Sequence, residues 1–110
     1  MPQAKNDTGT SRSAGGAVLE VQQDGAGQVW LELWTERGGD AGRAGARLVD
    51  EAVAEARSRR ARRVSTALDA AKPSCGIVLD ALRRHIGADV EGMATRRAGA
   101  SVMVDLQLRP

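Results

Sequence analysis

The sequence contains no phenylalanine and no tyrosine, and its only aromatic residues are Trp30 and Trp34. The apolar residues are therefore mainly Ala, Val, Leu and Ile, which pack well between short elements but supply few large side chains to a core. A chain of 110 residues is long enough for one domain and too short for two. Because a small aliphatic core gains from being extended by a second copy, we expect a homodimer.

Other absences narrow the range of functions. The single cysteine, Cys75, excludes an intramolecular disulfide and a cysteine-based zinc site, and we expect no metal. No apolar run approaches the ~20 residues that span a bilayer, and the N-terminus has no hydrophobic segment typical of a secretory signal. We therefore expect a cytoplasmic protein without a membrane partner. The net charge of +2 is too small to indicate nucleic-acid binding.

Residues 1–16 are mostly polar or glycine and contain almost nothing apolar. Such a segment cannot bury enough surface to offset the entropy lost on ordering. The composition therefore predicts a disordered tail over 1–16 and a single α/β domain over 17–110.

Within the predicted domain, apolar residues alternate in some segments and recur at helical spacing in others. This predicts an α/β (α+β) fold of order β-β-α-β-α-β-β, with a mixed, mainly antiparallel sheet of about five strands and two helices packed on it. The strand at 28–36 carries large apolar residues on both faces, which indicates a central position. Strands are expected at 17–22, 28–36, 64–68, 90–96 and 101–108, and helices at 41–60 and 73–86.

Two surface patterns have more than one interpretation. The arginine cluster at 57–63 either contacts phosphate or complements the dipole of the helix end, and the lack of interleaved aromatic residues favours the second. Trp30 and Trp34 lie on the same face of one predicted strand. They either line a ligand groove beside Glu32 or belong to the core or an oligomer interface, and we favour core or interface.

No catalytic group can be identified from the sequence. Cys75 lies near a predicted helix N-terminus, where a thiolate is stabilised. The only histidine, His85, lies about three turns along the same helix, too far away to act as its base. A general base could be among the carboxylates on or beside the strands, which are Glu32, Glu36, Asp69 and Asp105.

The turn after the predicted central strand is rich in Gly and Arg. The run Gly42-Arg43-Ala44-Gly45-Ala46-Arg47-Leu48 is similar to the run of Arg and Gly that leads into a Leu in the GNAT N-acetyltransferase superfamily. The element order resembles the C-terminal half of that fold, in which the amides of a helix N-terminus hold the coenzyme A pyrophosphate. The resemblance implies binding of coenzyme A or acetyl-CoA by Trp34, Thr35, Arg43, Ala44, Gly45 and Ala46.

Two later segments extend the resemblance over most of residues 17–108. The segment 72–79 is similar to the Asn-Pro-rich entry to the family's next helix, and 102–106 is similar to its terminal hairpin. The family often uses a Tyr as general acid where this chain has Leu79, and the N-terminal half of the family fold has no counterpart here. We therefore expect a GNAT-like acyl-CoA-binding domain without full acetyltransferase activity. The alternative is a non-enzymatic homodimeric protein-interaction module that uses the tryptophan strand or the arginine-rich helix end.

Overall fold

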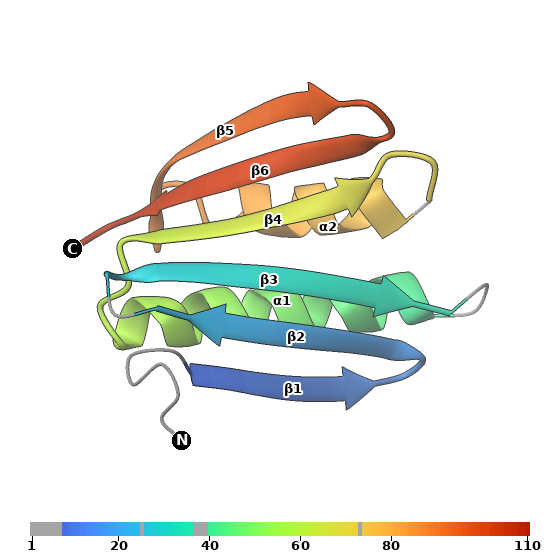
Figure 1. Cartoon of the computed structure of the whole chain (residues 1–110), viewed down its shortest axis with the longest axis horizontal. Coiled ribbons are helices and arrows are strands. Elements are labelled where there is room, and N and C mark those ends of the chain that lie inside the picture. Colours follow the sequence, from blue (N-terminus) through green and yellow to red (C-terminus); the bar gives the residue numbers. More distant parts are fainter. Residues whose placement is uncertain (1–7, 25, 37–39, 73) are drawn as a thin grey trace, which may run out of the picture.

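The computed structural model describes residues 8–24, 26–36, 40–72 and 74–110. These residues form one mixed six-stranded sheet of order β1-β2-β3-β4-β6-β5 and two helices (Figure 1). Strands β3 and β4 pair in parallel, and the other neighbouring strands pair antiparallel. The elements are β1 (Thr8–Ala14), β2 (Ala17–Gln23), β3 (Gln28–Thr35), α1 (Ala41–Ser58), β4 (Arg63–Asp69), α2 (Ser74–Arg83), β5 (Val90–Ala98) and β6 (Ser101–Leu108).

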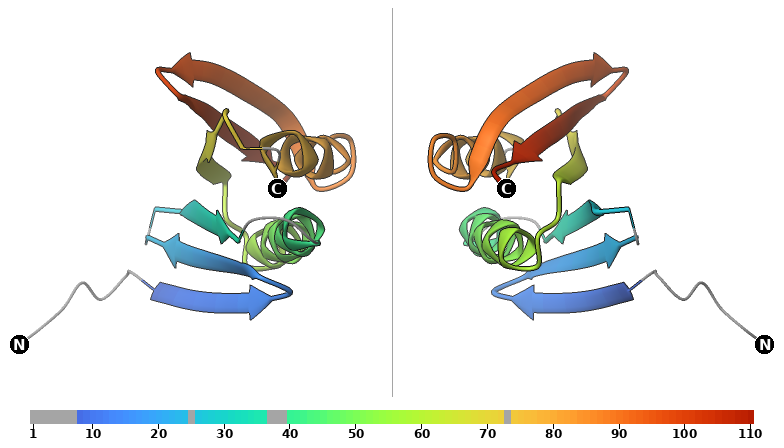
Figure 2. Two further views of the ribbon diagram at one scale, coloured as in Figure 1. Left: turned by 90° about the vertical axis from the view of Figure 1, so that its right-hand side faces the viewer. Right: turned by 90° about the vertical axis from the view of Figure 1, so that its left-hand side faces the viewer.

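Both helices cover the same face of the sheet and lie side by side (Figure 2). The predicted α+β class, with two helices packed on a mixed sheet, is therefore confirmed, and β3 has the central position expected of it. We call the opposite face, which no described element covers, the open face. Its side chains include the half-exposed Trp30 and Trp34.

The sheet has six strands, so the prediction of five is wrong. The additional strand is β1, which lies within the segment that composition predicted to be a disordered tail. A two-residue hairpin turn joins it to β2, and Gly15 and Gly16 both adopt positive φ, of 53° and 85°, as this turn type requires. Arg12 of β1 also forms an ion pair with Glu55 of α1. Residues 1–7 of the predicted tail lie outside the described residues.

Helix α1 forms because its apolar residues recur on one side and face the sheet and α2. It ends two residues earlier than predicted, at Ser58, where the chain turns out of the helix. Arg60 takes a left-handed φ of 63°, and the amide of Ala61 donates a hydrogen bond of 2.9 Å to the carbonyl of Ala56. The turn directs the chain into β4. Helix α2 is also shorter than predicted, and Pro73, its expected first residue, lies outside the described residues.

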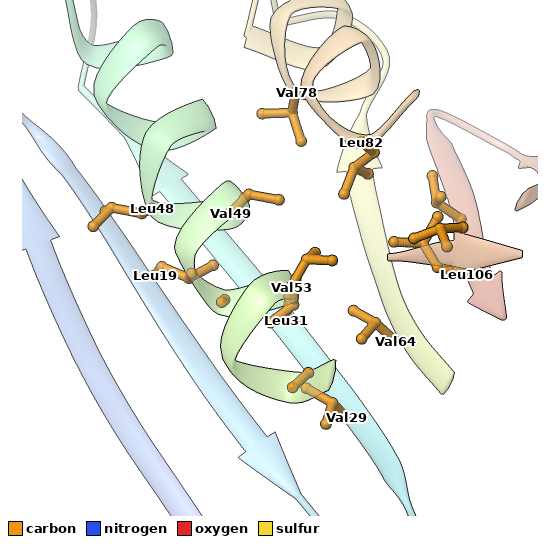
Figure 3. Packing of buried hydrophobic residues seen from close by; sticks show 14 of the residues in the cluster. Leu19, Val29, Leu31, Leu48, Val49, Val53, Val64, Val78, Leu82 and Leu106 are labelled. Carbon is orange, nitrogen blue, oxygen red and sulfur yellow. The ribbon is translucent and has the colours of Figure 1, made fainter. Parts of the chain in front are cut away.

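The core lies between the two helices and the covered face of the sheet (Figure 3). Apart from Cys75 its members are aliphatic, and the largest fully buried side chains are leucines and valines. Close packing of short branched side chains allows the helices to lie near the strands without aromatic residues. The residues that Figure 3 labels are Leu19, Val29, Leu31, Leu48, Val49, Val53, Val64, Val78, Leu82 and Leu106.

Candidate functional site

The parallel strands β3 and β4 separate before either of them ends. Their register runs from Gln28 with Arg63 to Leu31 with Thr66, although β3 continues to Thr35 and β4 to Asp69. Figure 1 shows the two strands diverging toward their C-terminal ends. At the last registered pair the buried hydroxyl of Thr66 donates a hydrogen bond of 3.0 Å to the carbonyl of Leu31. We call this divergence of the two C-terminal halves the splay.

Gly45 brings the first turns of α1 close to the end of β3. A Cβ atom added to Gly45 would lie 3.0 Å from a methyl carbon of Leu33 and 3.3 Å from Cγ2 of Thr35. A side chain at this position would crowd Leu33 and Thr35, and glycine avoids this contact. The predicted site residues Thr35 and Gly45 are therefore neighbours in space, although ten positions separate them in the chain.

The other predicted site residues lie on different surfaces. Arg43 is exposed on the first turn of α1, Ala44 packs near Gly15 of the β1–β2 turn, and Ala46 is buried. Trp34 points to the open face, away from α1. The structure thus brings part of the predicted set to the α1 start and part to the open face, on either side of the end of β3. Residues 37–39, which connect β3 to the helix, lie outside the described residues.

The N-terminus of α1 lacks a side-chain cap. Asp40 occupies the N-cap position that the sequence predicted, but its carboxylate accepts no capping hydrogen bond from the helix. The first turn of α1 contains no acidic residue. The described residues at this helix start therefore offer positively polarised amides and the guanidinium of Arg43 to an anion.

The open face carries a regular set of cross-strand pairs between β2 and β3. Val18 lies opposite Trp34, and Gln22 lies opposite Trp30. Between these two pairs Glu20 lies directly opposite Glu32. Like charges at directly opposed positions destabilise a sheet. Within the described part of the chain, neither carboxylate has a hydrogen-bond or ion-pair partner.

Two hollows of similar size open on this side of the sheet. The open-face groove, of about 420 Å³, crosses from β2 to β6 over the beginning of the splay and is lined by Glu20, Gln22, Trp30, Leu31, Glu32, Ala67 and Met103. The turn hollow, of about 400 Å³, lies between the β1–β2 turn and the end of β3 and is lined by residues 13–18 and 34–36. Trp30 and Trp34 therefore each border a different hollow. Both are half exposed, so they do not belong to the core.

A second polar cluster on the open face joins three strands. The side-chain amide of Gln28 donates a hydrogen bond to the hydroxyl of Ser65, and this hydroxyl in turn donates one to the carboxylate of Asp105. Ser65 is buried, so this network satisfies a polar group that would otherwise lose its solvation. Within the described residues this network contains no histidine, and the Asp105 carboxylate is the only group in it that is placed to act as a base toward Ser65.

His85 lies far from Cys75 and is held between two carboxylates. Its Nδ1 atom is 2.9 Å from Asp89, and its Nε2 atom is 2.9 Å from Asp50 of α1. The hydrogen bond from His85 and the nearby guanidinium of Arg57 lower the pKa of Asp89 below its ordinary value of 3.8. This cluster ties the end of α2 to α1, and no local pattern around His85 predicts it, because Asp50 lies 35 positions away in the chain.

The described residues include no group of three or more His, Cys, Asp or Glu side chains that could hold a metal ion. None of the described helices is both long and apolar enough to cross a membrane. No protein-family model matches the chain, and no curated protein matches it. The site must therefore be interpreted from its own geometry.

Proposed function

We propose that this chain is a GNAT-like domain that binds coenzyme A or an acyl-CoA at the splay between β3 and β4. The supporting observation is that the parallel register stops at Leu31 and Thr66 although both strands continue. Separated strands leave backbone groups that an extended, amide-containing ligand can pair with as an added strand. The pantetheine arm of coenzyme A has that chemistry.

The start of α1 suits the phosphate end of the same ligand. Its first-turn amides have no side-chain cap, and the exposed Arg43 adds a positive charge beside them. Gly45 supports this placement because it lets α1 begin close to the end of β3, within reach of a ligand in the splay. In this arrangement Thr35 lies near the start of α1 and Trp34 borders the turn hollow.

The proposal is for ligand binding rather than complete acetyl transfer. The sequence has no tyrosine to act as general acid, and Leu79 stands at the position where the resemblance places one. In the described residues the only histidine is engaged by Asp50 and Asp89, remote from the splay. A role in acyl-CoA binding without full catalysis is the function that this geometry supports best.

A homodimeric interaction module is the second candidate. The observation in its favour is the uncovered sheet face, on which Trp30 and Trp34 are 50% and 46% exposed. Aromatic residues are enriched at protein interfaces. Sedimentation velocity at two protein concentrations tests it, because a monomer at high concentration would contradict self-association.

Titration with coenzyme A and acetyl-CoA tests the first proposal. A ligand that binds only the folded state at about 100 times its Kd stabilises that state by about 2.7 kcal/mol, which a thermal-shift assay detects as a higher Tm. Arg43→Ala should weaken binding, whereas Arg47→Ala, which removes another exposed arginine one turn further along α1, should change it little. An unchanged Tm at millimolar ligand would refute acyl-CoA binding.

A further inference from the structure

The open-face groove combines three features that favour a positively charged occupant. Glu20 and Glu32 face one another across β2 and β3, and no cation in the described part of the chain neutralises them. The ring of Trp30 stands beside them, half exposed. An aromatic face attracts an ammonium or guanidinium group, and two nearby carboxylates add to that attraction.

The Glu20–Glu32 pair opposes stability in the isolated chain. Directly opposed like charges in a sheet cost free energy, and a stable fold would gain from a neutral residue at either position. In natural proteins, residues that lower the stability of the fold are concentrated at functional sites. A bound cation would remove this repulsion, so occupation of the groove would stabilise the sheet.

The rest of the groove suits the hydrocarbon part of a long basic side chain. Ala67 and Met103 line it together with the Trp30 ring, while the side chain of Leu31 points into the core on the other face. Lysine and arginine carry apolar stems that pack against such surfaces while the charged end is solvated or paired. A volume of about 420 Å³ lies near the lower end of the range for ligand pockets, which fits one side chain better than a large ligand.

The surface beyond the groove extends the contact along β2 and β3. Val18 and Trp34 form an exposed apolar pair next to the glutamates, on the same face. A free cation would leave this pair uncovered, whereas a peptide whose basic side chain enters the groove would cover it. A second copy of the chain placed face to face over the groove would bring four carboxylates together. Charge therefore favours a basic partner over self-association.

We propose that the open face docks an extended basic peptide of a partner protein, with one arginine or lysine side chain between Glu20 and Glu32 and its stem on Trp30. The inference does not depend on acyl-CoA binding, although the groove overlies the beginning of the splay where that ligand is placed. The chain has a net charge of +2, so general electrostatic attraction does not draw a basic peptide to it. Binding must come from a local acidic site.

Tryptophan fluorescence of the full chain tests the proposal directly, because both tryptophans lie on this face. The probe is a capped peptide in which Arg alternates with Ser, which places its arginines on one side when extended. We expect saturable binding that weakens as NaCl rises from about 50 mM to about 500 mM. The Glu20→Gln/Glu32→Gln double variant should lose roughly tenfold or more in affinity.

Two controls separate loss of binding from loss of structure. Glu91→Gln removes an exposed carboxylate on β5 and should leave peptide affinity unchanged. The double variant should keep or exceed the Tm of the wild type, since it relieves the repulsion. Equal peptide affinity of wild type and double variant would overturn the proposal. So would equally tight binding of free arginine amide, or a dimer that buries both tryptophans.

Discussion

Substitution of Gly45 by alanine tests the close approach of α1 to β3. The added Cβ would lie 3.0 Å and 3.3 Å from the two methyl carbons of Leu33 and 3.3 Å from Cγ2 of Thr35. To accept the new atom, the side chains of Leu33 and Thr35 must give way by a few tenths of an ångström, or α1 must shift away from β3.

Two opposing terms set the size of the effect. Extra atoms in a well-packed contact cost about 1–3 kcal/mol, whereas alanine in a helix is favoured over glycine by about 1 kcal/mol. The expected net loss in the free energy of unfolding is thus about 1 kcal/mol. In a domain of this size such a loss lowers Tm by about 4–8 °C. Urea and thermal unfolding followed by circular dichroism measure both quantities.

Gly76→Ala provides a matched control in the other helix. Gly76 lies in α2, and a Cβ atom there would have no neighbour within 4 Å. The control should gain up to about 1 kcal/mol from helix propensity alone. If Gly45→Ala gained as much as Gly76→Ala, the close contact between α1 and β3 would be refuted. The placement of the α1 start beside the splay would lose its main support.

Three further changes test other parts of the structure. Arg60→Gly should stabilise the fold by about 1 kcal/mol in urea unfolding, because glycine removes the strain of a left-handed φ of 63°, and a loss would contradict that backbone conformation. Thr66→Val should cost about 1–3 kcal/mol in the same assay by leaving the carbonyl of Leu31 without its hydrogen bond, and an unchanged stability would exclude that bond. The lowered pKa of Asp89 means that its contribution is present above its unfolded pKa of 3.8 and is lost as pH falls through the lower folded value. Asp89→Asn should therefore lower the free energy of unfolding at neutral pH and make that free energy fall less steeply as the pH is lowered. If the free energy fell as steeply in the variant as in the wild type, groups other than the Asp89–His85 pair would be responsible for the acid sensitivity.

Most elements could be predicted from the spacing of apolar residues. The last strand has the predicted bounds because Val102, Val104, Leu106 and Leu108 alternate without interruption. Composition does not predict the first strand, because its residues, 8–14, are almost all polar or small. Its one sequence signal is the pair Gly15-Gly16, which is typical of a two-residue hairpin turn.

The site was predictable only where it depends on a single strand. Alternation along β3 correctly placed Trp30, Glu32 and Trp34 on one face. The opposition of Glu20 and Glu32 depends on the register between two strands, which the intervening turn and the burial of one face determine together. The splay depends on where pairing between β3 and β4 stops. The end point of that pairing is determined by packing across the whole sheet. Neither property is encoded in a local pattern.

The position of the two tryptophans separates stability from function in this chain. A core without aromatic residues would gain most from burying them, since large apolar side chains contribute most to the hydrophobic effect. The sheet instead leaves Trp30 and Trp34 50% and 46% exposed, on either side of the Glu20–Glu32 pair. Single exposed apolar residues need no explanation, but two of the largest side chains grouped around unpaired charges do. The large apolar side chains that the core lacks therefore lie on the open face, where the proposed partner would cover them.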